Sequence, residues 1–149
     1  MRILTVHNPD DERLLRTKVP AFDFTAISKA ALRELIADMR KTMERAPGVG
    51  LSGNQLGLPY RFFVARDDGK FYAFFNPEIE KSSWETGELE EGCLSLPGVH
   101  VAVRRPEAIT LRAFDRNGKR VRLRAWGLLA RIFQHEIDHL NGVLITDYR

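Results

Sequence analysis

The sequence predicts a single α+β domain, and three observations lead to this prediction. Its 149 residues, 44% of them hydrophobic, suffice for one buried core. A helical apolar pattern comes first, β-type segments follow, and a second helical pattern lies near the C-terminus. This order favours α+β over a doubly wound sheet, which would alternate strands and helices regularly. We expect antiparallel or mixed β-sheets packed around a central C-terminal HExxH helix, with one long N-terminal helix.

The N-terminal third is expected to be helical in two places. Residues 8–16, NPDDERLLR, indicate a turn that leads into a short helical turn. A long helix should span residues 28–46, and Pro47 and Gly48 should end it. The apolar residues that recur there at helical spacing are Leu32, Leu35, Ile36, Met39 and Met43.

Four strands are expected in the middle of the chain. RFFVAR (residues 61–66) and FYAFFN (residues 71–76) are joined across DDGK. AITLRAFD (residues 108–115) and KRVRLRAW (residues 119–126) are joined across the hairpin turn RNG. In the last strand Val121, Leu123 and Ala125 alternate with arginines, which predicts one buried and one solvated face.

The final helix should run over residues 127–141, with Gly142 in the left-handed position that closes it. It is largely apolar through Leu129, Ile132, Phe133, Ile137 and Leu140. A core helix of this kind needs a reason for its polar residues, because burying a polar group without a partner is costly. The polar stretch QHEIDH therefore points to function.

His135 and His139 lie four residues apart, so a helix places them on one face where they can bind one metal ion. Glu136 is rotated by about 100° from His135, so its carboxylate can reach a water beside the metal without being a ligand. This arrangement is typical of HExxH hydrolases. The alternative is two surface histidines on a charged helix.

A catalytic metal site needs a third protein ligand. The longer metalloprotease pattern would place a histidine at Ile145, and Asp147 is the only carboxylate after His139. The single cysteine, Cys93 in EGCLSLPG, is therefore the main candidate, and being alone it forms no intrachain disulfide. The alternative for Cys93 is a packed core thiol.

The stretch GVGLSGNQ, residues 48–55, has three glycines that allow close backbone packing. Within it, Gln55 carries a neutral amide that can donate a hydrogen bond to a developing oxyanion. A flexible loop after the first helix is the alternative interpretation.

These three segments, in this order, closely resemble the peptide deformylase family. The family pattern is G-x-G-x-A-A-x-Q, then E-G-C-x-S, then Q-H-E-x-D-H, and the second and third parts match in full. The resemblance spans nearly the whole chain and implies one catalytic domain over residues 1–149. It implies a metal-dependent hydrolase that removes the N-formyl group from N-formylmethionyl peptides of newly made proteins and releases formate.

The resemblance also implies roles for individual residues. Glu136 would act as general acid and base, while Gln55 and the backbone N–H of Leu94 would hold the oxyanion. One divalent metal ion would be bound, Fe2+ in the native protein, which Zn2+, Ni2+ or Co2+ can replace. The implied metal ligands are Cys93, His135 and His139.

A formylated peptide would bind by adding a strand to a sheet edge, between Val49 and Gly50 on one side and Gly92 on the other. An apolar pocket would take the methionine side chain. The residues expected to line it are Val49, Leu89, Leu128 and Ile132. Ser95 and Asp138 would support the site, the alternatives being a turn hydroxyl and a solvated polar residue.

A net charge of +3 is too weak to indicate nucleic acid, so we expect no DNA partner. No leader is recognised and no apolar run reaches the length of a membrane span. We expect a cytoplasmic monomer that acts on nascent peptides. A solvated basic face, or alternatively a transient ribosome contact, is expected from Arg104, Arg105, Arg116, Lys119, Arg120, Arg122 and Arg124.

Three features depart from the family pattern. Ser52 and Gly53 replace two alanines, and Gly53 should loosen the backbone that carries Gln55. The sequence ends soon after the third segment, without the extra C-terminal helix of longer members. Arg131 stands where the family usually has an apolar residue beside the methionine pocket. We expect its guanidinium to lie at the pocket mouth with its head in water and to tune side-chain preference, or alternatively to point into solvent.

Two rival functions use the same residues. One is a metallopeptidase that cleaves ordinary amide bonds. The other is a non-catalytic, metal-stabilised binding module, against which the retention of both Glu136 and Gln55 argues.

Overall fold

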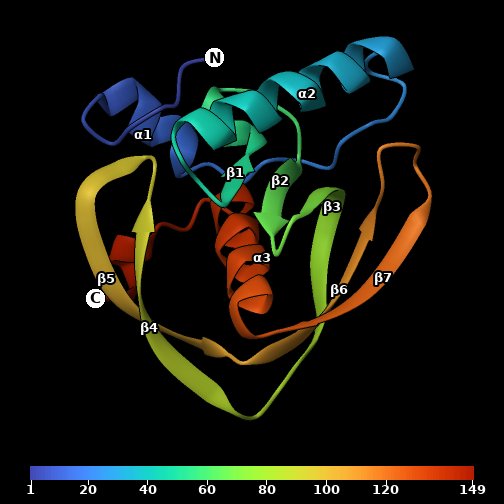
Figure 1. The fold of residues 1–149 in the computed structure, drawn as a ribbon. Coiled ribbons are helices and arrows are strands. Elements are labelled where there is room, and N and C mark those ends of the chain that lie inside the picture. The colour runs from blue at the N-terminus through green and yellow to red at the C-terminus, as the bar shows by residue number, and fades with distance from the viewer.

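The computed structural model describes all residues, 1–149, as two antiparallel sheets and three α-helices (Figure 1). The larger sheet has the order β1-β2-β3-β6-β7 and the smaller one pairs β4 with β5. The strands are β1 (Gly50–Ser52), β2 (Phe62–Asp67), β3 (Lys70–Ser82), β4 (Thr86–Cys93), β5 (Leu96–Pro106), β6 (Ala108–Phe114) and β7 (Arg120–Trp126). The helices are α1 (Pro9–Leu15), α2 (Lys29–Arg45) and α3 (Gly127–Leu140), with 3₁₀ turns η1 (Gly53–Leu56) and η2 (Ile145–Tyr148).

The two long helices confirm the sequence prediction to within one residue at each end. α2 begins after Ser28, whose hydroxyl accepts a hydrogen bond from the backbone N–H of Ala31 at 3.1 Å. α3 ends before Gly142, which has the expected left-handed conformation with φ 76°. None of the helices is long and apolar enough to cross a membrane.

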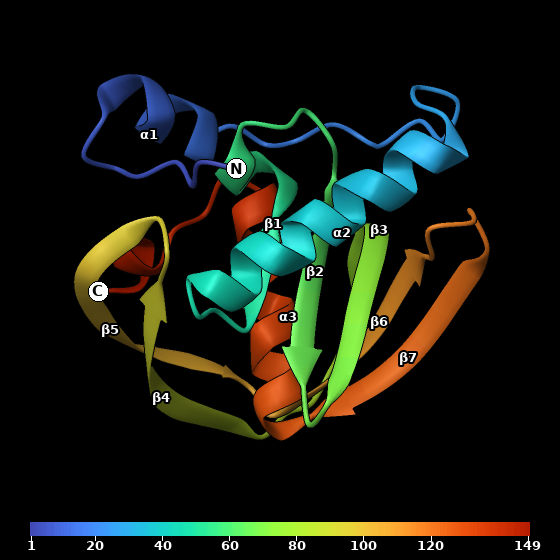
Figure 2. The ribbon, with the colours of Figure 1, turned by 45° about the horizontal axis from the view of Figure 1, so that its top comes forward.

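The five-stranded sheet is covered on both faces, by α2 on one and by α3 on the other (Figure 2). Phe62 and Val64 of β2 pack in the cluster that contains the buried face of α2. Phe63 and Ala65 pack in the cluster that contains Phe133 of α3. Successive side chains of a strand point to opposite faces of the sheet. Because both faces are covered here, the residues FFVA of β2 are all apolar instead of alternating between apolar and polar.

α3 lies in the middle of the molecule, between the five-stranded sheet and the β4–β5 hairpin (Figure 1). The predicted α+β architecture around a central C-terminal helix is thus confirmed, and both sheets are entirely antiparallel. The sequence did not predict the β4–β5 hairpin. Its pairing shifts register between Gly92 and Cys93, so β4 bends where it delivers Cys93 to α3.

Candidate active site

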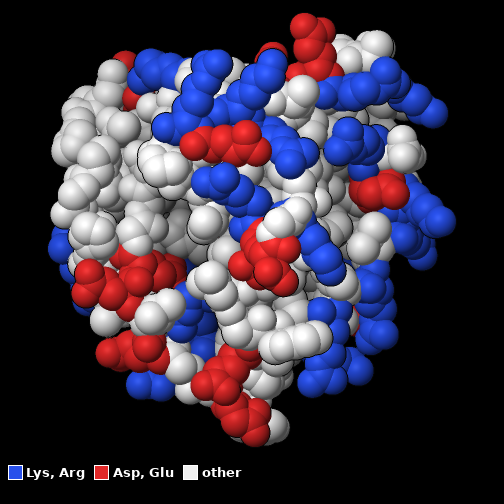
Figure 3. Space-filling view, in the orientation of Figure 1, with Lys and Arg blue, Asp and Glu red and all other residues white.

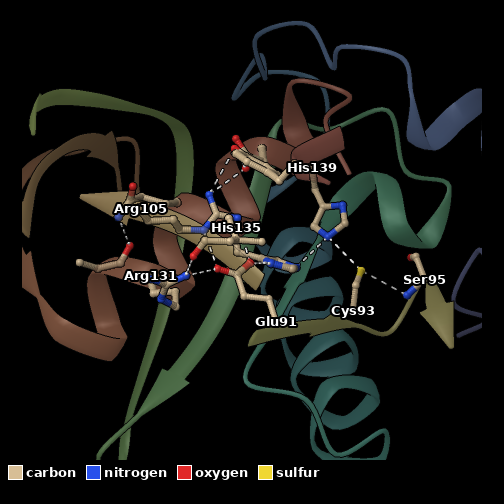
Figure 4. A network of polar contacts seen from close by, with 12 residues as sticks. Glu91, Cys93, Ser95, Arg105, Arg131, His135 and His139 are labelled. Carbon is tan, nitrogen blue, oxygen red and sulfur yellow. Dashed lines mark hydrogen bonds and ion pairs between the residues drawn. The ribbon is translucent and has the colours of Figure 1, made fainter. Parts of the chain in front are cut away.

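Three possible metal ligands from two elements converge beside the C-terminal half of α3. Cys93 ends β4, while His135 and His139 lie one turn apart on α3. The ligand atoms of all three lie within 4.8 Å of one another. The Nε2 atom of His139 is 3.2 Å from the Cys93 sulfur and 3.1 Å from the Nε2 atom of His135 (Figure 4).

This donor set fits a divalent metal ion. Two imidazole nitrogens bound to a tetrahedral ion at about 2.0–2.1 Å would lie about 3.3–3.4 Å apart, close to the spacing of the two histidines. A thiolate with two imidazoles suits zinc or ferrous iron, and three protein ligands leave a position open for chemistry. Burial lowers the pKa of His139 well below its usual value, which keeps this imidazole neutral and able to bind a metal.

Glu91 orients His135 from the other side of the ring. The Nδ1 atom of His135 lies 2.9 Å from the Glu91 carboxylate (Figure 4). Burial opposes the charge of Glu91, but hydrogen bonds from Arg105 and His135 outweigh burial and hold the pKa of Glu91 well below its usual range. The ionised carboxylate can only accept, so Nδ1 donates its proton and Nε2 is the ring atom left to bind a metal ion.

Glu136 has the properties of a general base. Its side chain is buried, and its Oε1 atom has no hydrogen-bond partner. Burial raises the pKa of Glu136 to about 7, although the charges of His135 and Arg105 oppose this shift. A carboxyl with a pKa near neutrality can both take and return a proton at physiological pH.

Gly50 leaves the space that Glu136 occupies. A methyl group added at Gly50 would lie 2.8 Å from the carboxyl carbon of Glu136, a clash that only movement can relieve. If Glu136 is the general base, Gly50→Ala should lower kcat/KM about tenfold or more, because displacing a catalytic group by about 1 Å can cost as much as 100-fold. Steady-state kinetics on formyl-Met-Ala would test this. Gly69→Ala strains a distant turn, because Gly69 has φ 74°, and so controls for general destabilisation without a clash at Glu136. Unchanged kinetics of Gly50→Ala would show that Glu136 has room to move.

The Gln55 amide is fixed with its nitrogen toward Cys93. Its Oε1 atom accepts a hydrogen bond from the backbone N–H of Ser52 at 3.0 Å, and the Ser52 hydroxyl lies 3.1 Å away. A backbone N–H can only donate, so the amide cannot be flipped. Its Nε2 atom therefore faces Ser95 Oγ at 3.0 Å and the Cys93 sulfur at 3.7 Å, where it can donate to a substrate oxygen.

Ser52 and Gly53, the residues that depart from the family pattern, are both closely packed. Gly53 packs too closely against a neighbouring segment to carry a side chain, because a methyl group there would lie 2.6 Å from the backbone oxygen of Tyr60. The Ser52 hydroxyl lies 2.8 Å from Asn54 Oδ1, and Asn54 Nδ2 donates to the backbone oxygen of His139 at 2.7 Å. Ser52 thus supports a link between Gln55 and the helix that carries both histidines.

Ser52→Ala should destabilise the protein, because Asn54 Oδ1 would lose its donor in a buried position. An unsatisfied buried acceptor costs about 1–3 kcal/mol in the free energy of unfolding. Urea denaturation would measure this, with the exposed Ser82→Ala as a control expected within about 0.5 kcal/mol of wild type. Equal stability of the two variants would show that another group or water satisfies Asn54.

A pocket of about 700 Å³ adjoins these groups and is lined by every residue that the sequence proposed for substrate binding. These residues are Val49, Gly50, Leu89, Gly92, Leu128, Arg131 and Ile132. Gln55, Cys93, Leu94, His135 and Glu136 also line it. β1 is an edge strand of its sheet and β4 pairs only with β5, so each strand has a free edge.

The structure places Arg105 and Glu91 in a network beside the site, where the sequence did not place them. Arg105 is buried and belongs to the Glu91 network, so its assignment to the solvated basic face is wrong. Asp138 accepts hydrogen bonds from Arg105 and Tyr148, in a supporting position. Glu91 was missed, although its position two residues before Cys93 on a strand would place both side chains on one face.

Arg131 also differs from both sequence expectations. Its side chain is 13% exposed, and its guanidinium donates to Glu91 at 2.6 Å rather than lying in water. The prediction of a guanidinium head in water at the pocket mouth is therefore wrong, and so is its solvent-facing alternative. Exposed basic side chains instead lie along α2 and over β6 and β7, while acidic ones lie over β4 (Figure 3).

Comparisons with known proteins agree with this geometry. The family model described as "Polypeptide deformylase" matches residues 1–149. "Peptide deformylase 1" of Pseudomonas syringae pv. tomato is 42% identical over 151 aligned residues, which cover 99% of this chain and 88% of that protein. The peptide deformylase of Rhizobium meliloti is 47% identical over 124 residues, covering 80% of this chain and 71% of that protein.

Solved structures show the same similarity. The crystal structure of peptide deformylase from Thermotoga maritima superposes with a TM-score of 0.88 at 38% identity, covering 99% of this chain and 95% of that one. A peptide deformylase from Synechococcus elongatus in complex with actinonin gives a TM-score of 0.89 at 36% identity, covering 99% of this chain and 78% of that one.

Proposed function

The chain belongs to the polypeptide deformylase family, metal-dependent hydrolases that remove the N-formyl group from nascent peptides, and from this premise we propose how its own residues perform the reaction. One observation carries the proposal. The sulfur of Cys93 and the two histidine nitrogens converge within 4.8 Å, beside the buried and unpaired carboxyl of Glu136.

Cys93, His135 and His139 would hold one divalent ion, Fe2+ in the native protein, and Zn2+, Ni2+ or Co2+ could take its place. Such an ion would lower the pKa of a water and polarise the formyl carbonyl. Metal analysis of protein purified without oxygen tests this assignment. We expect iron in a one-to-one ratio, whereas fully active protein that contains only zinc would contradict the iron assignment.

Glu136 takes a proton from the attacking water, whose oxygen bonds to the formyl carbon. The carbonyl oxygen becomes negative, and Gln55 Nε2 and the backbone N–H of Leu94 donate to it. Glu136 then gives its proton to the nitrogen of the leaving amine, and the C–N bond breaks. The products are formate and a peptide with a free N-terminus.

The substrate lies as an extended strand between the free edges of β1 and β4. The backbone of Val49 and Gly50 on one side and of Gly92 on the other accommodates it. The methionine side chain enters the pocket beside Leu89, Leu128 and Ile132, with Val49 at its edge. Ile132 is buried whereas Leu128 is about half exposed, which suits a pocket with a closed base and an open mouth.

Hydrolysis assays on three peptides separate this function from its rivals. We expect turnover of formyl-Met-Ala, and no turnover of acetyl-Met-Ala or of the unblocked peptide Met-Ala-Ser. Cleavage of the internal amide of Met-Ala-Ser would instead indicate a metallopeptidase. A protein that holds its metal but turns over none of the three would be a binding module.

The protein works as a cytoplasmic monomer on formylated nascent chains. The exposed arginines of β7, Arg120 and Arg124, belong to a solvated basic face, and a transient ribosome contact is the alternative. Ribosome cosedimentation of wild type, lost in the Arg120→Ala, Arg124→Ala double variant, would favour that alternative.

A further inference from the structure

Arg131 makes three hydrogen bonds to the β4–β5 hairpin from its position on α3, one turn before His135. Its Nη1 atom donates to Glu91 Oε2 at 2.6 Å and to the backbone oxygen of Val103 at 2.9 Å. Its Nη2 atom donates to the backbone oxygen of Gly87 at 2.8 Å. The acceptors thus lie on both strands of the hairpin, and the guanidinium is directed at Glu91 (Figure 4).

The proposed metal ligands come from the two units that Arg131 joins. Cys93 belongs to the hairpin, whereas His135 and His139 belong to α3. Polar side chains join the hairpin to α3 at several points. Other polar links between α3 and the hairpin come from Arg105, His135 and Gln134. Only Arg131 joins α3 both to a carboxylate of the hairpin and to a backbone carbonyl on each of its two strands.

Arg131 also acts on the partner of His135. Glu91 Oε2 accepts from both Arg131 and Arg105, which leaves Oε1 facing the Nδ1 atom of His135. Without Arg131, the bonds between Arg105 and Glu91 would remain, because Arg105 donates to both carboxylate oxygens. Loss of Arg131 should therefore weaken the alignment of the ligands without removing any ligand.

We propose that Arg131 is a positioning residue that holds the cysteine-bearing hairpin and Glu91 against α3, and so governs how tightly the metal is retained. This inference rests on the proposed ligand set of Cys93, His135 and His139. The sequence suggested that Arg131 tunes the preference for substrate side chains. In the structure its guanidinium instead donates to three acceptors of the protein, which favours a role in metal retention.

The test measures how fast metal leaves Zn2+-loaded protein in excess chelator. Arg131→Met keeps the length of the side chain but removes all three donors, and we expect metal loss about tenfold faster, in line with other residues that hold metal ligands in place. Arg131→Lys keeps the positive charge but lacks the planar guanidinium. Its rate of metal loss should therefore lie between those of wild type and Arg131→Met. Arg124→Met, which alters an exposed arginine of β7, should match wild type.

The same proteins are assayed on formyl-Met-Ala-Ser and formyl-Met-Ala-Glu, and the ratio of kcat/KM between the peptides should not change in Arg131→Met. A changed ratio with an unaltered rate of metal loss would overturn the inference, because Arg131 would then act on the substrate. Wild type that loads no zinc would instead refute the ligand set itself. Circular dichroism shows whether Arg131→Met folds. If it does not fold, Arg131→Lys serves as the test variant. Metal loss from the folded variant at the wild-type rate would overturn the inference.

Discussion

Glu136→Gln should retain its metal and lose nearly all turnover. The Glu136 carboxyl is not among the three atoms that converge as ligands, so the metal should remain. Glutamine has almost the same shape and keeps the contact with Gly50, but its amide cannot take a proton from water or give one to the leaving amine. General acid–base groups contribute about 100-fold or more, so kcat should fall by at least that factor.

Steady-state kinetics on formyl-Met-Ala, with metal content measured on the same samples, would check this expectation. Glu88→Gln makes the same chemical change at an exposed position of β4 and should stay within about twofold of wild type. A Glu136→Gln protein with full metal and more than about a tenth of the wild-type rate would exclude Glu136 as the base.

The parts of the fold that the sequence predicts are those with strong local periodicity. The apolar residues of α2 and α3 recur at helical spacing, and both helices lie within one residue of the predicted ends. The histidine pair could be placed for the same reason, since the geometry of a single helix determines that His135 and His139 share a face.

The β4–β5 hairpin escaped prediction because β4 is a free edge strand that buries little. Within TGELEEGC only Glu91 is fully buried, so no alternation of apolar and polar residues marks the strand. Pairing with β5 and packing against α3 create that burial, and neither is visible in a local window of sequence.

Arg105 and Arg131 were misplaced for a related reason. Arginine is seldom buried unless it is paired, so each was assigned to the surface. Both pair with Glu91, which lies 14 residues from Arg105 and 40 residues from Arg131 along the chain. A local pattern carries no signal at such separations, and only the topology shows that the charges meet.

Cys93→Ser should lower metal affinity and thermal stability together. A hydroxyl is far less readily ionised than a thiol and is a poorer ligand for zinc or iron, while serine has nearly the same shape as cysteine. Metal bound only to the folded state stabilises it by mass action. A 100-fold loss of affinity in excess metal therefore costs about 2.7 kcal/mol. For a protein of this size that free energy corresponds to a fall in Tm of roughly 5–10 °C.

Metal-free wild type is the decisive control, because it separates the metal contribution from packing of the side chain. If Cys93 acts as a ligand, thermal melts of wild type and Cys93→Ser should differ with metal present and coincide once a chelator has removed it. Cys93 is only partly buried, so loss of its packing alone should have a small effect. A Tm difference that stays the same with and without metal would make Cys93 a structural thiol, and the third ligand would then have to come from elsewhere in the pocket.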